Sequence, residues 1–271
     1  MSLWIDTHCH LDAGEFDADR SAVAVRAHER GVAAIVLPAV QRSNWTTVAT
    51  LAGQVQGGCY ALGIHPLWAA SASDADLDAL EQAVDAAMAD PRFVAIGEIG
   101  LDLFVAEAIA AIDRQEIVLR RQLEIARRHR LPVLLHIRRA QDKVLKHLRA
   151  VRVEGGTAHA FNGSRQQAQA FADLGLKLGV GGAMTYPRAL RIRDIASFMP
   201  IDTLVLETDS PDIAPEWISR GRNEPAEVVR IGETLAALRG IEVEQLREAT
   251  AANAIAILPR LATALTMEPL R

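Results

Sequence analysis

Short apolar runs alternate with longer amphipathic segments along the whole chain, and eight such pairs follow one another without a linker rich in Pro, Gly or Ser. This alternation predicts parallel strands joined by helices. Each run is nearly all apolar, as expected of strands that are buried on both faces. The expected strands span residues 3–6, 33–37, 60–64, 93–97, 132–136, 157–160, 177–180 and 203–207.

Helical periodicity is clearest over residues 113–130, where Leu119, Leu123 and Ala126 fall on one stripe and arginines cover much of the rest. Glycine and serine mark the ends of helical stretches, because glycine suits a left-handed C-cap and serine suits an N-cap. The expected caps are Gly31, Gly175 and Gly240 at helix C-termini and Ser73 and Ser164 at N-termini.

Two architectures compete for this pattern, a closed (β/α)8 barrel and an open doubly wound sheet. The repeats have similar lengths, and polar residues follow strands dispersed over the whole chain, which only a closed ring would bring to one centre. The chain also lacks a glycine-rich phosphate loop, the usual ligand signature of the open sheet. We therefore predict one TIM barrel domain over residues 1–271, with an extra C-terminal helix from 243 to about 258 packed outside the barrel.

Composition narrows the class of protein. A chain of 271 residues, half of them hydrophobic, can bury one sizeable core, and its formal charge of -5 gives no reason to expect tight binding of duplex DNA over the general surface. Cys9 and Cys59 form no C-x-x-C pair, which favours a reducing cytoplasm over a disulfide scaffold or thiolate zinc site. Without a signal-peptide pattern or an apolar run of eighteen residues, we expect a cytoplasmic protein with no membrane span.

The end of the first strand carries the first candidate ligands, His8 and His10. Their two-residue spacing puts both imidazoles on the same side of an extended backbone, and imidazole nitrogens suit transition metals. Alone, such a pair also fits a turn in which the histidines are hydrogen-bonded or solvated.

The same kind of residue recurs at other strand ends. Histidines at or near strand ends are His8, His10, His65, His136 and His159, whereas His28, His129 and His147 fall in helices and are expected to be solvated. Glu98 and Asp209 add carboxylates after the fourth and eighth strands. Each residue alone could be a cap, an ion-pair partner or a core histidine. Together they would be costly to bury without metal, so we predict a metal site formed by His8, His10, Glu98, His136, His159 and Asp209.

Five ordered blocks resemble the signature of the TatD family of metal-dependent deoxyribonucleases. They are HCHLD at 8–12, GIHP at 63–66, GEIGLD at 97–102, HAFNGS at 159–164 and ETDSP at 207–211. The runs LDLF at 101–104 and GVGGAMTYPR at 179–188 resemble its YjjV-like branch more closely.

The resemblance implies an amidohydrolase-type barrel, two divalent cations and hydrolysis of phosphodiester bonds, typically in DNA with an exposed single-stranded end. The implied metal ligands are His8, His10 and Asp209 for one cation, His136 and His159 for the second, and Glu98 as the bridge. The donor atoms suit Zn²⁺, Mn²⁺, Co²⁺, Ni²⁺ or Mg²⁺. Ile137 and Asp212 depart from residues common in the family and bear on substrate preference.

The catalytic roles follow from this centre. Bound cations would lower the pKa of a water and polarise a phosphoryl oxygen. We expect Asp209 to orient that water and accept its proton, and Glu98 to hold the cations together.

Residues on the predicted catalytic face are candidates for binding the substrate. They are His65, Arg138, Arg139 and Asn223, although His65 also fits a loop-stabilising hydrogen bond and at least one arginine a solvated surface position. Four aromatic residues fall in loops after strands, and one or two could stack on bases instead of anchoring their own loops. These are Trp68, Phe104, Tyr186 and Trp217.

Two rival functions share the barrel: an amidohydrolase that cleaves C–N or C–O bonds of a small molecule, and a non-catalytic binding protein. The first often uses a modified lysine as bridging ligand, and no lysine lies near the ends of the fourth and fifth strands. The second is disfavoured because all six ligand positions are kept. The expected partner is therefore single-stranded DNA as substrate, with no membrane and no obligatory protein partner.

Overall fold

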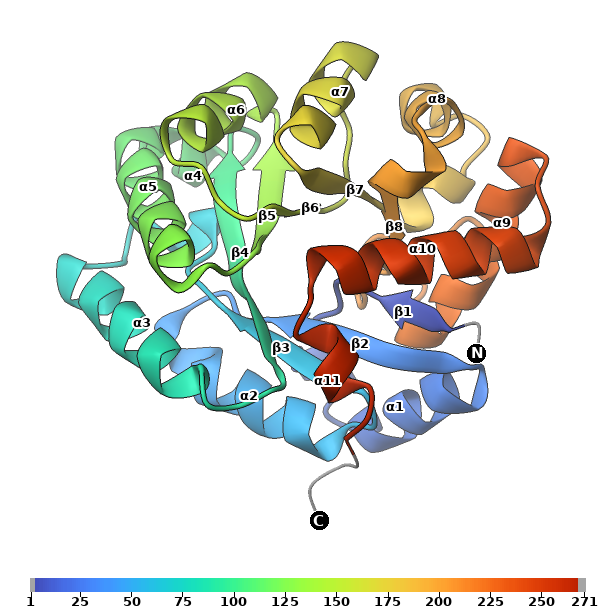
Figure 1. The fold of residues 1–271 in the computed structure, drawn as a ribbon, viewed down its shortest axis with the longest axis horizontal. Helices are drawn as coiled ribbons and strands as arrows, with labels where there is room; N and C mark the ends of the chain where they lie inside the picture. The colour runs from blue at the N-terminus through green and yellow to red at the C-terminus, as the bar shows by residue number, and fades with distance from the viewer. Residues whose placement is uncertain (1–2, 268–271) are drawn as a thin grey trace.

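The computed structural model describes residues 3–267, so residues 1–2 and 268–271 of the predicted domain lie outside the described residues. Eight parallel strands form one sheet in which each strand pairs with its neighbours in sequence, and helices surround them (Figure 1). The strands are β1 Trp4–Asp6, β2 Val32–Pro38, β3 Gly58–Leu62, β4 Phe93–Asp102, β5 Val133–Arg138, β6 Gly156–Ala158, β7 Leu176–Val180 and β8 Leu204–Leu206.

Backbone hydrogen bonds join the last strand to the first and close the barrel. Thr7 N donates to Leu206 O at 3.0 Å, and Asp209 N donates to His8 O at 2.9 Å. An open sheet would leave β1 and β8 on opposite edges, so the predicted barrel is confirmed.

The two helices predicted over residues 113–130 and 243 to about 258 are present within one residue of those bounds. The helices are α1 Arg20–Glu29, α2 Trp45–Gln54, α3 Asp74–Ala87, α4 Ala106–Ala110, α5 Ile112–His129, α6 Gln141–Ala150, α7 Arg165–Asp173, α8 Leu190–Phe198, α9 Val228–Arg239, α10 Val243–Ile257 and α11 Leu261–Ala264. Short 3-10 turns are η1 Gly14–Phe16, η2 Arg42–Asn44, η3 Pro66–Trp68, η4 Gly182–Thr185, η5 Ile201–Thr203 and η6 Pro225–Glu227. None of the helices within residues 3–267 is long and apolar enough to cross a bilayer.

The predicted caps are confirmed. Gly31, Gly175 and Gly240 have φ angles of 87°, 84° and 65°, in the left-handed region that glycine adopts without a steric penalty. Ser73 and Ser164 each form a capping box with the third residue of the helix that follows.

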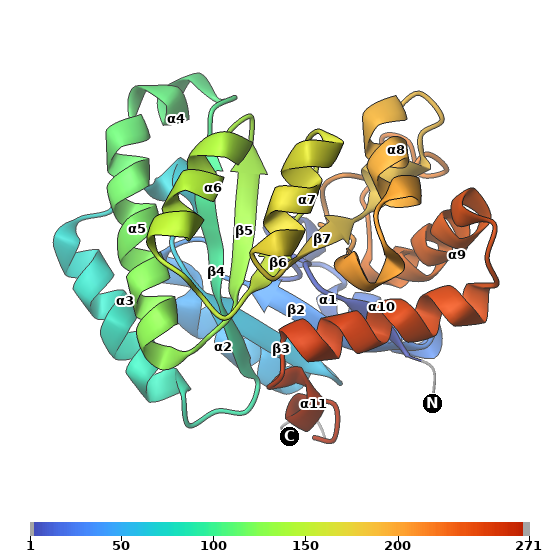
Figure 2. The same ribbon diagram turned by 45° about the horizontal axis from the view of Figure 1, so that its top comes forward.

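The C-terminal helices lie across one end of the barrel and not in the outer ring (Figures 1 and 2). Leu258 and Leu261 are fully buried against small residues that the strands point inward, such as Ala34 and Ala95. Asn253 donates to Leu204 O at 2.8 Å, at the first residue of β8, so this is the N-terminal end of the strands. The predicted extra helix thus lies outside the barrel as expected, but it seals the barrel's floor.

Strand β4 runs five residues beyond its predicted end at Gly97. Its pairing with β5 shifts between Ile96 and Ile99, which is a bulge at Gly97 and Glu98. A Cβ on Gly97 would lie 2.6 Å from Leu134 Cβ, so this close approach of the two strands requires glycine. The bulge places Glu98 inside the strand with its side chain turned into the barrel mouth.

Candidate metal centre

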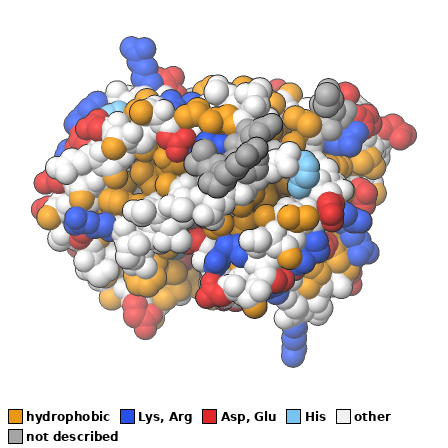
Figure 3. Space-filling view, turned by 90° about the horizontal axis from the view of Figure 1, so that it is seen from below, with side chains coloured by type: hydrophobic (Ala, Val, Ile, Leu, Met, Phe, Trp, Pro, Cys, Tyr) orange, Lys and Arg blue, Asp and Glu red, His pale blue; other side chains and the backbone are white. Residues whose placement is uncertain are grey.

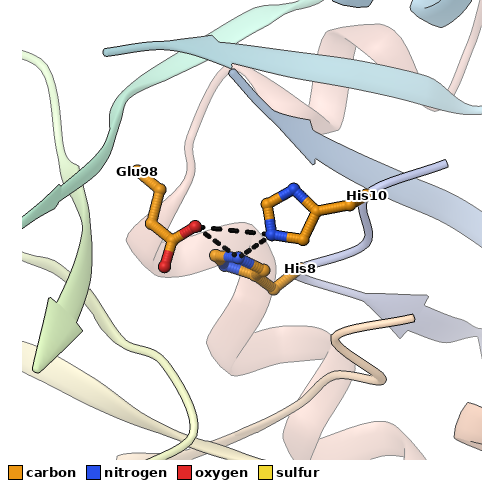
Figure 4. A group of neighbouring side chains, drawn as sticks. All are labelled: His8, His10 and Glu98. Atoms are coloured by element: carbon orange, nitrogen blue, oxygen red, sulfur yellow. Dashed lines mark hydrogen bonds and ion pairs between the residues drawn. The ribbon is translucent and has the colours of Figure 1, made fainter. Parts of the chain in front are cut away.

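The polar residues predicted at the strand ends meet at the C-terminal mouth of the barrel. The carboxylate of Glu98 lies at their centre. Its Oε2 atom is 3.3 Å from His8 Nε2 and 3.4 Å from His10 Nε2, an arrangement seen in Figure 4. Its Oε1 atom faces three other imidazoles, at 2.9 Å from His136 Nδ1, 3.4 Å from His65 Nε2 and 3.5 Å from His159 Nε2.

Asp209 completes the side of the site formed by β1 and β8. Its Oδ1 atom is 3.7 Å from His8 Nε2, 3.6 Å from His10 Nε2 and 3.9 Å from His159 Nδ1. The structure therefore brings together all six predicted ligands, of which Glu98 and His136 lie in β4 and β5 and the others directly follow β1, β6 and β8.

The donor atoms fall into three groups, each compact enough to hold a cation. The groups are His8, His10 and Glu98; His8, His159 and Asp209; and His65, Glu98 and His136, with the ligand atoms of each group within 4.8 Å of one another. The atoms are imidazole nitrogens and carboxylate oxygens, which bind divalent transition metals. The residues present thus fit the divalent cations that the fold family implies.

His65 lies inside this cluster, whereas the sequence placed it outside the ligand set. Its Nδ1 atom accepts a hydrogen bond from Leu67 N at 3.1 Å, which caps η3 and matches the alternative of a loop-stabilising bond. Its Nε2 atom remains free to face Glu98 beside His136. His65 follows β3 at a spacing similar to that of the other ligands after their strands. This spacing could have indicated from the sequence that His65 lies in the cluster.

A buried carboxylate couples the two strand ends that carry His8 and Asp209. Asp6 Oδ1 accepts hydrogen bonds from His8 N at 3.2 Å and Thr208 N at 2.9 Å, and Asp6 Oδ2 accepts from Thr208 Oγ1 at 2.6 Å. Burial raises the pKa of Asp6 to about 8, against the lowering effect of these bonds. The network holds the H-x-H segment in register with the Asp209 loop.

The imidazoles and carboxylates balance one another's charge. Burial, followed by the nearby charge of His159, lowers the pKa of His8 to about 3, so His8 is neutral. Burial acts in the same direction on His10, but its hydrogen bond and ion pair with Glu98 prevail and raise the pKa to about 9. Burial opposes ionisation of Glu98, yet the facing imidazoles hold its pKa well below the usual range. A cation entering this cluster must displace imidazole protons, so metal binding releases protons.

Two of the three histidines predicted in helices, His129 and His147, are less exposed than expected. The side chain of His147 is 12% exposed and lies 3.1 Å from Glu116, and that of His129 is 13% exposed and lies 3.5 Å from Asp85. The expectation that the helical histidines are solvated is confirmed for His28, which is exposed, and was wrong for His129 and His147, which lie beside carboxylates of neighbouring helices.

Arg138 and Arg139, at the end of β5, are exposed and stack on one aromatic ring. Their guanidinium carbons lie 3.8 Å and 4.6 Å from the ring centroid of Phe104, a residue that is 45% exposed. Arg138 lies two residues beyond His136 in the same strand, so both side chains project from the same face of β5. The cluster therefore borders the metal centre.

Asn223 is fully buried, and its side-chain amide forms its hydrogen bonds with backbone groups. Its Nδ2 atom donates to Thr208 O at 2.8 Å and to Asp212 O at 2.9 Å, and its Oδ1 atom accepts from Glu224 N. These bonds fold the loop that carries Asp209. The expected contact between Asn223 and substrate gains no support from this position.

The four candidate stacking residues divide into two pairs. Tyr186 donates its hydroxyl hydrogen to Ala214 O, and Trp217 donates its indole N–H to Glu227, so both anchor their own loops. Trp68 is 43% exposed and, like Phe104, presents its ring to solvent. Trp68 also lines a cavity of about 490 Å³ between the loops after β2 and β3, together with Ile64 and Gln41.

Comparison with known proteins places this centre in a family. The model of TatD related DNase matches residues 5–259. The chain belongs to the TatD family. An Escherichia coli (strain K12) member, the uncharacterized metal-dependent hydrolase YjjV, is 40% identical over 92% of this chain and 95% of the relative. The crystal structure of that TatD homologue matches with a TM-score of 0.89 at 39% identity, covering 94% of this chain and 98% of the other.

A more distant TatD-family member has a stated activity. The 3'-5' ssDNA/RNA exonuclease TatD of Klebsiella pneumoniae (strain 342) is 32% identical over 92% of this chain and 95% of the relative. The chain is thus a metal-dependent hydrolase of the TatD family, and its similarity to YjjV confirms the predicted branch.

Proposed function

We propose that this TatD-family hydrolase is a two-metal deoxyribonuclease that cleaves phosphodiester bonds at single-stranded DNA ends. The proposal rests on the observation that the two oxygens of one carboxylate face two different groups of imidazoles. Glu98 Oε2 faces His8 and His10, whereas Glu98 Oε1 faces His65, His136 and His159. A carboxylate whose two oxygens serve separate imidazole groups is suited to bridge two cations. The family model's description as a DNase and the stated activity of the Klebsiella relative support phosphodiesters as substrates.

The cations, when bound, supply Lewis acidity that lowers the pKa of a water and neutralises charge on the phosphoryl oxygens. His8, His10 and Asp209 would hold one cation, and His136 and His159 the other. Glu98 stays ionised because the facing imidazoles lower its pKa, so it can serve both groups at once.

Asp209 is the proposed proton acceptor. Burial raises its pKa to about 6, against the opposing effect of His159 and His10. A carboxylate with a pKa near the working pH is well matched to accept a proton from an attacking water. Its side chain is 13% exposed, more than that of Glu98 at 3%, so Asp209 reaches the open side of the cluster.

Substrate binding is proposed for the rim beside this cluster. Arg138 and Arg139 would contact backbone phosphates, while Phe104 and Trp68 offer exposed rings on which unpaired bases can stack. His65 would contact the scissile phosphate, since its Nε2 atom faces the site. An unpaired end is favoured over a duplex because bases in a duplex are already stacked on one another.

On the face seen in Figure 3, the acidic, basic and hydrophobic side chains of the described residues are intermixed. The net charge of -5 is consistent with recognition that is confined to the barrel mouth. Cys9 and Cys59 are free and buried, which supports action in a reducing compartment such as the cytoplasm.

The test is an assay with an end-labelled single-stranded oligonucleotide and added Mn²⁺ or Zn²⁺. We expect Asp209→Asn to lower kcat by about 100-fold or more with little change in Tm, since a positioned acid or base contributes about 10²–10⁴-fold. Asp202→Asn, an exposed aspartate in η5 before β8 and thus at the opposite end of the barrel, is the matched control and should keep full activity. Near-wild-type activity of Asp209→Asn would remove Asp209 from the mechanism. Turnover of lactones or cyclic amides without cleavage of any oligonucleotide would replace the nuclease by an amidohydrolase.

A further inference from the structure

His136 lies between two carboxylates, and only one of them belongs to the ligand set. Its Nδ1 atom is 2.9 Å from Glu98 Oε1, and its Nε2 atom is 3.0 Å from Asp102 Oδ2. A metal-ligating histidine that donates its second N–H to a carboxylate is held in one tautomer and one orientation.

Asp102 is itself rigidly held. Its side chain is fully buried, and its Oδ1 atom accepts hydrogen bonds from Phe104 N at 2.7 Å and Val105 N at 3.0 Å. These two bonds satisfy Oδ1 and leave Oδ2 for His136. The carboxylate therefore cannot rotate away from the imidazole without losing two backbone partners.

A buried glutamine on α5 fixes the backbone of Asp102 in turn. Gln115 Oε1 accepts from Asp102 N at 2.8 Å, and Gln115 Nε2 donates to Asp102 O at 3.2 Å and to Ala108 O at 2.5 Å. The primary amide thus pairs with both backbone groups of one residue, much as a neighbouring strand would. Gln115 has no exposed surface, so every polar atom of its side chain is used within the protein.

A second glutamine on α5, seven residues after Gln115, also pairs with both backbone groups of one residue. Gln122, also fully buried, accepts from Ile64 N at 2.7 Å and donates to Ile64 O at 3.0 Å. Ile64 precedes His65, so the same helix fixes the backbone beside both histidines on this side of the centre. Residues seven apart lie on one face of a helix, which explains how α5 reaches both strand ends.

We propose that Asp102, clamped by Gln115, is a positioning residue that keeps the proton of His136 on Nε2 and leaves the Nδ1 lone pair directed at the site bridged by Glu98. This inference rests on the proposed metal centre and extends it to residues that touch neither cation nor substrate. Asp102 acts through His136, and Gln115 acts through Asp102.

The substitution Asp102→Asn tests this inference because an amide reverses the hydrogen bond. The Asn oxygen must still accept from Phe104 N and Val105 N, so its NH₂ group turns toward His136 Nε2. An Nε2 atom that faces a donor becomes an acceptor, and the proton moves to Nδ1, where it blocks ligation.

The measurement is calorimetric titration with Zn²⁺ alone. We expect Asp102→Asn to weaken one of two Zn²⁺ equivalents by about 10–100-fold and to leave the other unchanged. Gln115→Met, which keeps the volume but loses the clamp, should weaken the same equivalent by a smaller factor. Asp113→Asn, an exposed residue at the start of α5, is the matched control and should bind both equivalents as the wild type does.

Nitrogen-15 NMR of the Zn²⁺-loaded protein supplies a second readout that simple loss of packing would not produce. The wild type should show His136 protonated at Nε2, and Asp102→Asn should lose that signal. If Asp102→Asn fails to fold, the same two measurements on Gln115→Met decide the question. Two unchanged Zn²⁺ equivalents together with a retained Nε2 proton would overturn the inference. Neither measurement uses a substrate. A wild type that fails to cleave DNA would therefore contradict the nuclease proposal and leave the inference about Asp102 unaffected.

Discussion

The two ends of this barrel contain opposite kinds of side chain. At the C-terminal mouth, five imidazoles surround Glu98, with Asp209 beside them. At the N-terminal floor, small apolar residues of the strands pack against Leu258 and Leu261 of the C-terminal segment. Burying polar groups at the mouth opposes folding, whereas burying apolar groups at the floor favours it. The difference indicates that the floor contributes mainly to stability and the mouth to metal binding and chemistry. Substitutions at one end should therefore leave the property of the other end unchanged.

The largest effect expected at the floor comes from Leu258→Ala. Leu258 is fully buried, and the truncation leaves a cavity against the inner faces of the strands. We expect the free energy of unfolding in urea to fall by about 2–5 kcal/mol. Zn²⁺ affinity should be unchanged, and a clear loss of affinity would show that the two ends are coupled.

Removing the metal with a chelator should lower stability through the mouth of the barrel, without any change at the floor. A ligand present at 100 to 1,000 times its Kd stabilises the folded state by about 2.7–4.1 kcal/mol, so a chelator should lower stability by a similar amount. The losses from chelator and from Leu258→Ala should add to within about 0.5 kcal/mol, because the sites share no partners. Glu98→Gln is the control, since chelator should change its stability far less. A strongly non-additive result would contradict the separation of the two ends.

We expect a smaller effect, on the binding of an oligonucleotide, from a substitution at the rim of the mouth. Phe104→Ala removes an exposed ring beside Arg138 and Arg139 and should weaken binding of a single-stranded oligonucleotide by about 1–3 kcal/mol, with Tm nearly unchanged. Phe198 is a matched control, because it is 53% exposed and stacked 3.8 Å from the guanidinium carbon of Arg165, but it lies on α8 in the outer ring. Equal losses in Phe104→Ala and Phe198→Ala would mean that stacking at the mouth is not specific.

The smallest effect concerns helix ends around the mouth. Ser164 Oγ accepts from Gln167 N at 3.1 Å, and Ser164 N donates to Gln167 Oε1 at 3.0 Å. Ser164→Ala should lower stability by about 1 kcal/mol, measured by thermal unfolding, and should leave metal affinity unchanged. A loss above about 2 kcal/mol would show that the mouth contributes more to stability than the comparison allows.

Much of the fold could be predicted because strand and helix periods differ and eight repeats exclude most alternatives. The error at β4 has a specific cause. Gly97 was interpreted as the end of a strand, whereas it allows β4 to approach Leu134 and continue to Asp102. Glycine marks either a terminus or a close contact, and only the neighbouring strand decides between them.

The candidate ligands could be predicted for a similar reason: parallel strands in a closed ring bring their ends to one centre. The partners behind the ligands could not be predicted. The contact between Asp102 and His136 depends on the register of β4 with β5, and the Gln115 clamp depends on where α5 packs. Asn223 looked accessible in a polar loop, but that loop folds around its amide.

The hydrogen bonds that close the barrel bear on the order in which the protein acquires activity during synthesis. Cys9 and Ser210, whose side chains are 3.1 Å apart, are separated by 201 residues, and the neighbouring Asp209 N–H bonds to His8 O. On the ribosome, His8 and His10 emerge long before Asp209. A nascent chain therefore carries an incomplete centre until Asp209 has been made, and hydrolytic activity would arise only after both the first and the eighth strands are present.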